Sequence, residues 1–160
     1  MIKIIYEDDH MFAVDKPAGL ISVPGPNIPE HKTVQGIVRR QLAEAGKDYK
    51  SYLLNRLDRE TSGIMLFGKY PRDREALEGI FKHQVSEPSA GAEKTYLALV
   101  KGTPRFPQST INFFLESRGK KEKIPAVTHY RILKQLGILS MLEVKIETGR
   151  KHQIRKHLAA

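Results

Sequence analysis

Two carboxylates alternate with two arginines in the segment Leu54–Gly68, which reads LNRLDRETSGIMLFG. The carboxylates belong to Asp58 and Glu60, and the guanidinium groups belong to Arg56 and Arg59. An ionised carboxylate can act as a nucleophile or as a base, and a cation beside it favours its charged form. The same residue types also fit a solvated salt-bridge cluster, which is the more frequent outcome for such a loop. Spacing alone therefore leaves catalysis and a surface ion-pair cluster both open.

An apolar run follows this cluster and predicts the element that must position it. Residues 64–67 are all apolar and are bounded by Gly63 and Gly68, a pattern typical of a short buried strand. Thr61-Ser62-Gly63 supplies the small hydrogen-bonding residues of a tight turn. The polar cluster is thus expected in the loop that enters a buried strand.

The composition narrows the class of protein. A chain of 160 residues predicts one compact domain, and 27 Lys plus Arg against 18 Asp plus Glu give a formal charge of +9. Such an excess predicts a polyanionic partner, with RNA or DNA first. The chain has no cysteine, which excludes disulfides and Cys-zinc sites, and no apolar run approaches the ~20 residues of a membrane span. The N-terminus lacks the features of a signal peptide, so we expect a cytoplasmic protein.

The first half of the chain predicts a hairpin, a long loop and two helices. Ile2–Tyr6 and Met11–Val14 read as a β-hairpin, and Asp15–Asn27 reads as a Pro/Gly-rich loop that is either mobile or functional. Thr33 is expected to cap a helix with an apolar face, and Pro71 is expected to open a second one. The predicted core faces are Val34, Ile37, Val38 and Leu42 in the first helix and Ala76, Leu77, Ile80 and Phe81 in the second. Arg39 and Arg40 fit either a solvated helix face or a phosphate contact.

The second half predicts mostly strands. Residues 94–102 read as a strand with Tyr96, Ala98 and Val100 on one face, and Tyr96 is either a core aromatic or a ring that stacks on a ligand. Residues 103–125 read as a loop with a short strand at 111–115, and Lys120, Lys121 and Lys123 make it a candidate phosphate-contacting arm or a solvated loop. Residues 127–133 and 138–146 are expected to pair antiparallel about a turn at 135–137. The fold class is therefore α+β, with mainly antiparallel strands flanked by helices and loops.

The last segment, 148–158, is basic and is expected to become helical after Gly149. Its Lys and Arg residues are Arg150, Lys151, Arg155 and Lys156. They can meet a carboxylate or a phosphate. His152 and His157 lie five residues apart, which does not align two ligands on one helical face, so we expect no metal site.

The order of four motifs carries more information than any one of them. DKPAGLISVPG, NRLDRETSG, KTYLALVKG and TGRKHQIRKHL follow one another along the chain. In this order they resemble the RluA family of RNA pseudouridine synthases, over roughly Ile4 to Leu158. The resemblance implies the pseudouridine synthase fold and the isomerisation of uridine in folded RNA, with the N1–C1′ bond replaced by a C5–C1′ bond. It implies no outside cofactor.

The resemblance also assigns roles to individual residues. It implies that Asp58 is the catalytic aspartate, that Tyr96 packs on the target uracil and that Arg155 pairs with the aspartate. Arg56 is implied to fill the gap that the flipped uridine leaves in the RNA stack. The residues expected to contact RNA are Arg56, Arg59, Lys94, Arg150, Lys151 and His152.

The chain departs from the family pattern at Asn55, where the family usually has His. Family members also continue past HQIRKHL into a Gly-rich turn and further strands, and many carry an S4 module before the catalytic domain. We therefore expect a stand-alone type that lacks the S4 module and the family's last strands. Apolar side chains around Ile154 and Leu158 would then be partly open, which predicts either that the chain is shorter than its natural product or that it self-associates.

Two alternatives to the synthase remain at this point. The first is a nucleoside hydrolase that uses Asp58 and Glu60 as a carboxylate pair and releases free uracil. The second is a catalytically weak RNA-binding protein built on the same fold. The LISVPG stretch resembles family members that act on both tRNA and large-subunit rRNA, so the expected partner is rRNA and/or tRNA.

Overall fold

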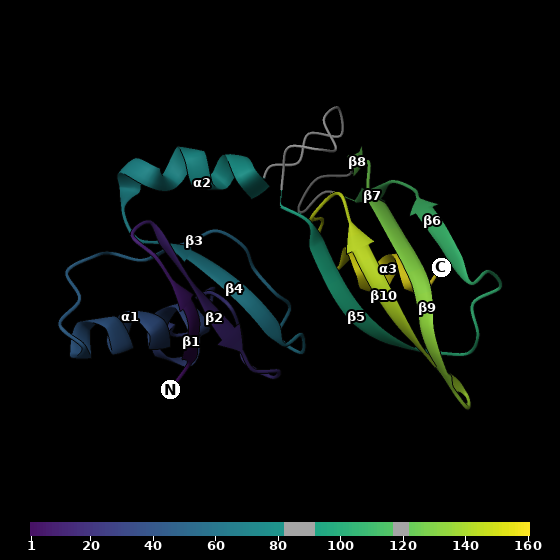
Figure 1. The fold of residues 1–160 in the computed structure, drawn as a ribbon, viewed down its shortest axis with the longest axis horizontal. Helices are drawn as coiled ribbons and strands as arrows, with labels where there is room; N and C mark the ends of the chain where they lie inside the picture. The colour runs from purple at the N-terminus through teal and green to yellow at the C-terminus, as the bar shows by residue number, and fades with distance from the viewer. Residues whose placement is uncertain (82–91, 117–121) are drawn as a thin grey trace. The chain divides into compact units, whose positions relative to one another are not determined.

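The computed structural model describes residues 1–81, 92–116 and 122–160, which divide into two compact units, Met1–Lys82 and His83–Ala160 (Figure 1). Each unit has a four-stranded antiparallel sheet. The α+β class expected from the sequence is confirmed, since helices and antiparallel strands both occur. The assignment of residues 1–160 to one catalytic domain stays a prediction.

The sheet of the first unit contains the predicted hairpin. Its strands are β1 (Lys3–Glu7), β2 (Met11–Lys16), β3 (Tyr52–Leu53) and β4 (Gly63–Gly68), arranged in the order β1-β2-β4-β3. Asp8 closes the hairpin turn, because its Oδ1 accepts hydrogen bonds of 2.8 Å from the backbone N–H groups of His10 and Met11. Strand β4, which follows the Asp58 loop, lies between β2 and β3 in this sheet.

Helix α1 (Val34–Glu44) builds the core of this unit with the sheet. Thr33 caps it as predicted, since its Oγ1 accepts a 3.1 Å hydrogen bond from Gly36 N–H. The buried cluster consists of Ile2, Phe12, Val14, Val34, Val38, Leu42, Tyr49, Met65 and Phe67. A Cβ at Gly36 would lie 2.0 Å from the carbonyl oxygen of Glu30 in the short 3-10 helix η1 (Glu30–Lys32), so only glycine fits there.

Two expectations for this unit need correction. The apolar run 64–67 was predicted to form a buried strand, but within this run only Met65 and Phe67 are fully buried, whereas Ile64 is 56% exposed. The second helix begins as a 3-10 turn, η2 (Pro71–Asp73), and continues as α2 (Arg74–Phe81). In α2 Leu77 is buried but Ala76 and Ile80 are exposed, so the predicted apolar face is wrong for those two residues. The side chain of Phe81 lies outside the described residues.

The second unit is built around the predicted antiparallel pair. Strands β5 (Lys94–Lys101), β10 (Leu139–Ile146), β9 (Val127–Leu136) and β6 (Gln108–Asn112) follow in that order across the sheet. Gly137 makes the β9–β10 turn with a φ of 61°, a conformation that favours glycine. The sequence placed one short strand at 111–115, which is wrong in its bounds because the strand pairs with β9 over 108–112 instead.

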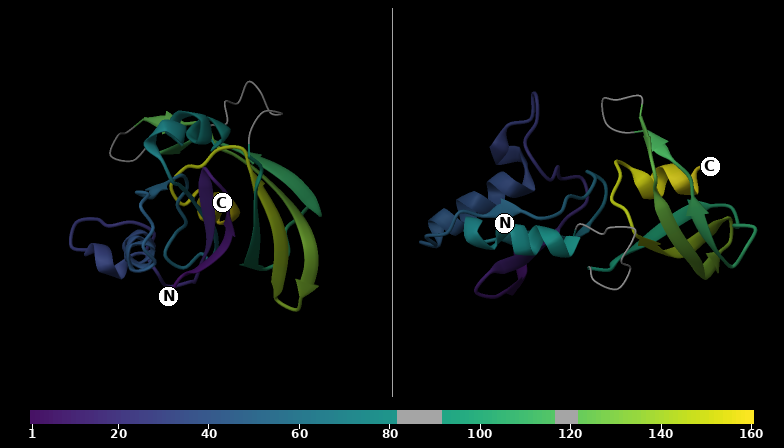
Figure 2. Two further views of the ribbon diagram at one scale, coloured as in Figure 1. Left: turned by 60° about the vertical axis from the view of Figure 1, so that its left-hand side comes forward. Right: turned by 90° about the horizontal axis from the view of Figure 1, so that it is seen from above.

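Two further elements complete this unit. Strands β7 (Leu115–Glu116) and β8 (Lys123–Ile124) pair with each other, so the described part of the predicted loop at 103–125 contains three short strands. Lys123 lies in β8 and is exposed, while Lys120 and Lys121 lie outside the described residues. Helix α3 (Gln153–Leu158) lies against the sheet and contacts β9 (Figure 2). Where the structure describes the chain, no helix has the length and apolar character needed to cross a membrane.

Candidate active site

Asp58 lies in the loop between β3 and β4. After β3, Leu54 and Asn55 still form hydrogen bonds with β4 before the backbone leaves the sheet. Leu54 N–H donates to the carbonyl of Leu66 at 2.9 Å. The side chain of Asn55 then continues the pattern, since its Oδ1 accepts from Leu66 N–H at 2.7 Å and its Nδ2 donates to Ile64 O at 3.2 Å. Asp58 itself is half-buried and opens a turn that Thr61 N–H closes on the Asp58 carbonyl at 3.1 Å.

A second segment, residues 16–22, runs beside this turn and is hydrogen-bonded to it. Gly19 N–H donates to Arg59 O at 2.8 Å, and Arg59 Nε donates back to Gly19 O at 3.1 Å. Ser22 Oγ donates to Leu57 O at 2.6 Å and accepts from Leu57 N–H at 3.2 Å. The residues on both sides of Asp58 are thus fixed by a segment about 40 residues earlier in the chain.

Helix α1 in turn holds the supporting segment. The N–H groups at the start of a helix have no partner within the helix. Here Val34 N–H donates to Ile21 O at 2.8 Å, and Gln35 N–H donates to Ser22 O at 3.1 Å. The segment that the sequence described as mobile or functional therefore connects the helix N-terminus to the Asp58 turn.

The charged residues around Asp58 differ in their environments. Arg56, Arg59 and Glu60 are exposed, and Arg59 Nε lies 3.4 Å from Glu60 Oε1 with both side chains more than 60% exposed. An exposed pair of this kind contributes at most about 1 kcal/mol to stability. The predicted ion-pair cluster therefore exists at Arg59 and Glu60 but does not account for the hydrogen bonds that fix the loop. The exposed side chains of Arg56 and Arg59 remain accessible to an anionic ligand.

Tyr96 is placed by the alternation of strand β5. Its partner in the adjacent β10 strand is Val144, which is fully buried, and Lys94 and Ala98 share the same face. On the opposite face Leu97 is 72% exposed, so the predicted alternation is confirmed. Tyr96 is half-buried. Burial lowers the pKa of the neighbouring Lys94 ammonium group from its ordinary value.

The basic segment before α3 is organised by Gln153. This side chain is 3% exposed, and its Nε2 donates to Val127 O and to Thr128 Oγ1 at 2.9 and 3.0 Å. Its Oε1 accepts from Arg150 N–H at 3.0 Å, and Arg150 Nε donates to Pro125 O at 3.2 Å. Gln153 therefore ties the segment to the start of β9.

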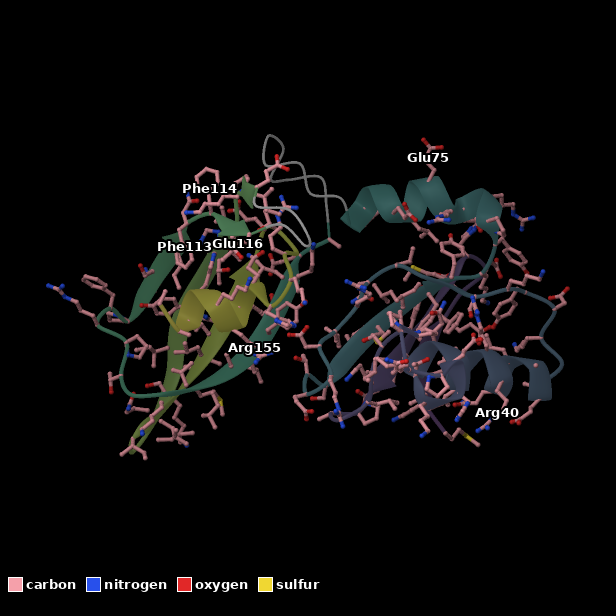
Figure 3. All side chains as sticks on the ribbon, turned by 180° about the vertical axis from the view of Figure 1, so that it is seen from behind. Arg40, Glu75, Phe113, Phe114, Glu116 and Arg155 are labelled. Carbon is pink, nitrogen blue, oxygen red and sulfur yellow. The ribbon has the colours of Figure 1, made fainter. Side chains whose placement is uncertain are left out.

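The remaining predicted residues of this segment lie around the helix N-terminus. His152 is half-buried and adopts a left-handed φ of 55°, and Lys151 is exposed. Arg155 is exposed on α3 (Figure 3). His157 is 2% exposed and packs on Phe113 with 4.3 Å between ring centroids. This burial and ring contact make His157 a packing residue of the helix. Burial also lowers the pKa of its imidazole.

Comparisons with known proteins agree with the motif order. A family model described as RNA pseudouridylate synthase matches residues 10–160. An uncharacterized RNA pseudouridine synthase of Synechocystis is 34% identical over 98% of this chain and 50% of its own length. A protein of Xylella fastidiosa named ribosomal large subunit pseudouridine synthase D is 34% identical over 99% of this chain and 48% of its own.

The chain belongs to the RNA pseudouridylate synthase family. The RluA-type resemblance is thereby confirmed. The human protein RNA Pseudouridylate Synthase Domain Containing 4 has the same fold, with a TM-score of 0.73 over 98% of this chain and 63% of that one at 21% identity. The chain spans about half the length of the curated relatives it matches.

Within this pseudouridylate synthase family member, the site residues fall into three groups. Arg56, Asp58 and Arg59 share one loop of the first unit, Lys94 and Tyr96 share one face of β5, and residues 150–155 follow β10. The pairing of Asp58 with Arg155 stays a prediction.

Sequence reasoning missed several residues that support these groups, namely Lys16, Ser22 and Gln153. For Lys16 a signal existed, because Phe12, Val14 and Lys16 alternate along β2 and all three are fully buried.

Proposed function

We propose that this chain carries the catalytic site of an RNA pseudouridine synthase, with Asp58 as the catalytic carboxylate. The single observation that carries the proposal is the Asp58 turn, a half-buried carboxylate whose flanking backbone is hydrogen-bonded on both sides to residues 16–22. Catalysis requires a reacting group to be held in a defined place, and a surface ion-pair loop has no such requirement. Membership of the family supports the same reading.

The chemistry explains the residue types. A uridine in a stem or loop must leave its stack before its ribose can be reached, at a cost of about a few kcal/mol. The Asp58 carboxylate then either attacks C1′ or removes the C2′ proton, and in both routes the N1–C1′ bond breaks while the uracil stays in the pocket. After the base rotates, C5 bonds to C1′ as the Asp58–C1′ ester breaks or as the C2′ proton is returned. The proton on C5 then leaves to solvent, and N1 takes up a proton. No external oxidant, reductant or metal ion is needed for this balance.

The other site residues have supporting roles in the proposal. The half-buried Tyr96 ring stacks on the extruded uracil and offsets part of the cost of flipping. By the family resemblance, Arg155 is proposed to pair with Asp58 and to favour its ionised form. Arg56 fills the gap in the RNA stack, and the phosphate contacts come from Arg59, Lys94, Arg150, Lys151 and His152.

The proposed substrate class is structured ribosomal RNA, because the Xylella relative is named for the large ribosomal subunit. Transfer RNA is a second proposed substrate. Self-association stays a prediction, with Ile154 and Leu158 half-buried. The cytoplasmic location also stays a prediction.

Tritium release from RNA labelled at C5 of uridine tests the proposal. The purified chain should release tritium from rRNA or tRNA transcripts, and Asp58→Asn should abolish release while RNA affinity stays nearly unchanged. Glu60→Gln is the matched control, since Glu60 is an exposed carboxylate in the same turn and should keep its activity. Free uracil among the products would identify a hydrolase instead. RNA binding without tritium release would identify an RNA-binding protein on the synthase fold.

A further inference from the structure

A pocket of about 380 Å³ is lined by the second half of helix α1 and by residues within the segment 47–51, which follows the helix. Its volume is in the range of small-ligand sites, about 300–1,000 Å³. Among the residues that the structure describes, its lining includes none from the Asp58 turn or from residues 16–22. Leu42 in the lining follows Val34 by eight residues, which is about 12 Å along the helix axis from the end that binds Ile21. The pocket is therefore separate from the proposed uridine site.

Every charged side chain that lines this pocket is a cation. These side chains are Arg39, Lys47 and Lys50, and all three are exposed. Arg39 Nη1 lies 2.7 Å from Glu30 Oε1, and Lys47 Nζ lies 3.4 Å from Glu7 Oε1. Lys50 forms no ion pair with any residue in the described part of the chain. Guanidinium and ammonium groups are the usual protein partners of phosphate, so the pocket has the charge of an anion site.

The wall of the pocket is apolar except for one hydroxyl group. Leu42 and Tyr49 are buried and belong to the core cluster of this unit, and the Tyr49 hydroxyl already donates to Glu7 Oε1 at 2.9 Å. Ser51 is 3% exposed, and its Oγ makes no hydrogen bond with the residues that the structure describes. A buried hydroxyl without a partner is unfavourable. A change of the serine rotamer would let a ligand in the pocket supply that partner.

We propose that this pocket binds one nucleotide of the substrate RNA, at a position in the RNA other than the target uridine. The phosphate of that nucleotide contacts Arg39, Lys47 and Lys50, and its ribose packs on Leu42. Contacts to phosphate carry no sequence information, so the pocket sets the orientation of the RNA and not the choice of uridine. The proposal rests on the proposed function, because its ligand is the substrate of the Asp58 site.

A free nucleotide would present the same phosphate and ribose to the pocket. A nucleotide within RNA is favoured by two observations. The chain has a formal charge of +9, which suits a polyanion better than a single phosphate. The family to which it belongs is described as RNA pseudouridylate synthase.

Two neighbouring arginines of α1 provide a matched pair for the test. Arg39 lines the pocket, whereas Arg40, the next residue of the same helix, is not among the lining residues (Figure 3). Both side chains are exposed, and each lies near one carboxylate, at 2.7 Å for Glu30 and 3.6 Å for Glu44. Either substitution by alanine therefore removes one exposed charge and one surface ion pair, but only Arg39→Ala changes the pocket.

The experiment measures the Kd of a fluorescently labelled rRNA transcript for the full chain over a series of salt concentrations. Arg39→Ala and Lys50→Ala should each raise the Kd at least about fivefold and reduce the salt slope by about 0.7–0.9, because one phosphate contact is lost. Arg40→Ala should change the Kd by less than about twofold. Ala43→Met places a larger side chain at an exposed lining position without changing the charge, so it should raise the Kd at least about threefold through a steric clash. Thermal melts check that each variant is folded.

Three results would overturn the proposal. They are an unchanged Kd in Arg39→Ala and Lys50→Ala, an equal rise of the Kd in Arg40→Ala, and an unchanged Kd in Ala43→Met. A second measurement adds uridine 5′-monophosphate and follows the amide resonances of Lys50 and Ser51 by NMR. Shifts of these resonances together with an unchanged RNA Kd in the pocket variants would identify a free nucleotide as the ligand and also overturn the proposal.

The Kd series does not depend on catalysis. A wild-type chain that binds the transcript but releases no tritium would contradict the proposed function, and the comparison of Arg39→Ala with Arg40→Ala would still decide whether the pocket contacts RNA. A wild-type chain that releases tritium, with equal Kd values for these two variants, would support the proposed function and overturn the RNA contact at the pocket.

Discussion

The side-chain oxygen of Asn55, in the Asp58 loop, accepts a hydrogen bond of 2.7 Å from the backbone N–H of Leu66 in β4. Together with the Nδ2 bond to Ile64 O, this contact extends the pairing of β3 with β4 by one residue. These two hydrogen bonds give the Asn55 side chain a structural role. The residue sets the point where the loop leaves the sheet.

Asn55→Ala should lower the free energy of unfolding by about 1–2 kcal/mol, because it leaves the part-buried Leu66 N–H without a partner. Asn55→Asp keeps an acceptor for Leu66 and loses only the more exposed bond to Ile64, so its loss should be smaller. Urea unfolding followed by circular dichroism measures both. Equal losses for the two variants would show that the bond to Leu66 contributes little.

Tyr96→Phe should reduce turnover less than Tyr96→Leu, because the phenyl ring keeps the face that stacks on an extruded base. Base–aromatic stacking contributes about 1–3 kcal/mol, which corresponds to roughly a five- to 150-fold difference in rate. Tritium release at saturating RNA is the measurement. Tyr130→Leu is the control, since Tyr130 is also opposite Val144 and half-buried on this sheet. Similar losses in Tyr96→Phe and Tyr96→Leu would assign the effect to the hydroxyl group.

The elements predicted correctly from the sequence are those formed by contacts between residues close in the chain. Periodicity and turn residues predicted the β1–β2 hairpin, α1 and the β9–β10 pair, because each depends on contacts between residues close in sequence. The short strand β6 was placed with wrong bounds, and the pairing of β7 with β8 was missed, since pairing partners and not composition define these strands. The apolar run at 64–67 gave no sign that Ile64 faces outward.

The candidate site shows the same division. The motif order assigned Asp58, Tyr96 and Arg155 through a resemblance, and no pattern within the chain would have assigned their roles. The hydrogen bonds that hold the Asp58 turn join residues 35–45 positions apart, from Leu57 with Ser22 to Thr61 with Lys16. Such contacts leave no local signal except the buried alternation that ends at Lys16.

RNA affinity should depend steeply on salt if the basic excess meets phosphates. The logarithm of the binding constant should fall linearly with the logarithm of salt concentration, with a slope of about −0.7 to −0.9 per phosphate contacted. Lys151→Ala should reduce the slope by about one such contact. Arg40, which is exposed on α1 and lies 3.6 Å from Glu44, is the control and should leave the slope unchanged when replaced by alanine. A flat salt response would contradict RNA as the partner.

Acid stability of the first unit should depend on a partly buried cluster around Glu7. Its Oε1 accepts from Lys69 Nζ at 2.8 Å and from Tyr49 Oη at 2.9 Å, and Lys47 Nζ lies 3.4 Å away. The hydrogen bond from Lys69 is the largest of the effects that lower the pKa of this carboxyl below its ordinary 4.5. The side chain is 30% exposed, so solvent screens part of this stabilisation.

The sign of the pH effect follows from that direction. Because the pKa is lower in the folded chain than in the unfolded chain, the ionised carboxylate stabilises the fold fully above about pH 4.5, and this contribution is lost as the pH falls through the folded pKa. Glu7→Gln should therefore cost about 1–2 kcal/mol near pH 7, where a charged hydrogen-bonding partner is lost. The gap between wild type and variant should close at low pH, where Glu7 is protonated and resembles glutamine.

Urea unfolding at a series of pH values between about 3 and 7 measures this difference directly, and the subtraction removes the contributions of other carboxylates. Glu75→Gln is the control, since Glu75 is exposed and its side chain projects outward from α2 (Figure 3). That substitution should change the stability by less than about 0.5 kcal/mol at every pH. A constant difference between wild type and Glu7→Gln across the series would show that packing, and not the charge of Glu7, determines the loss.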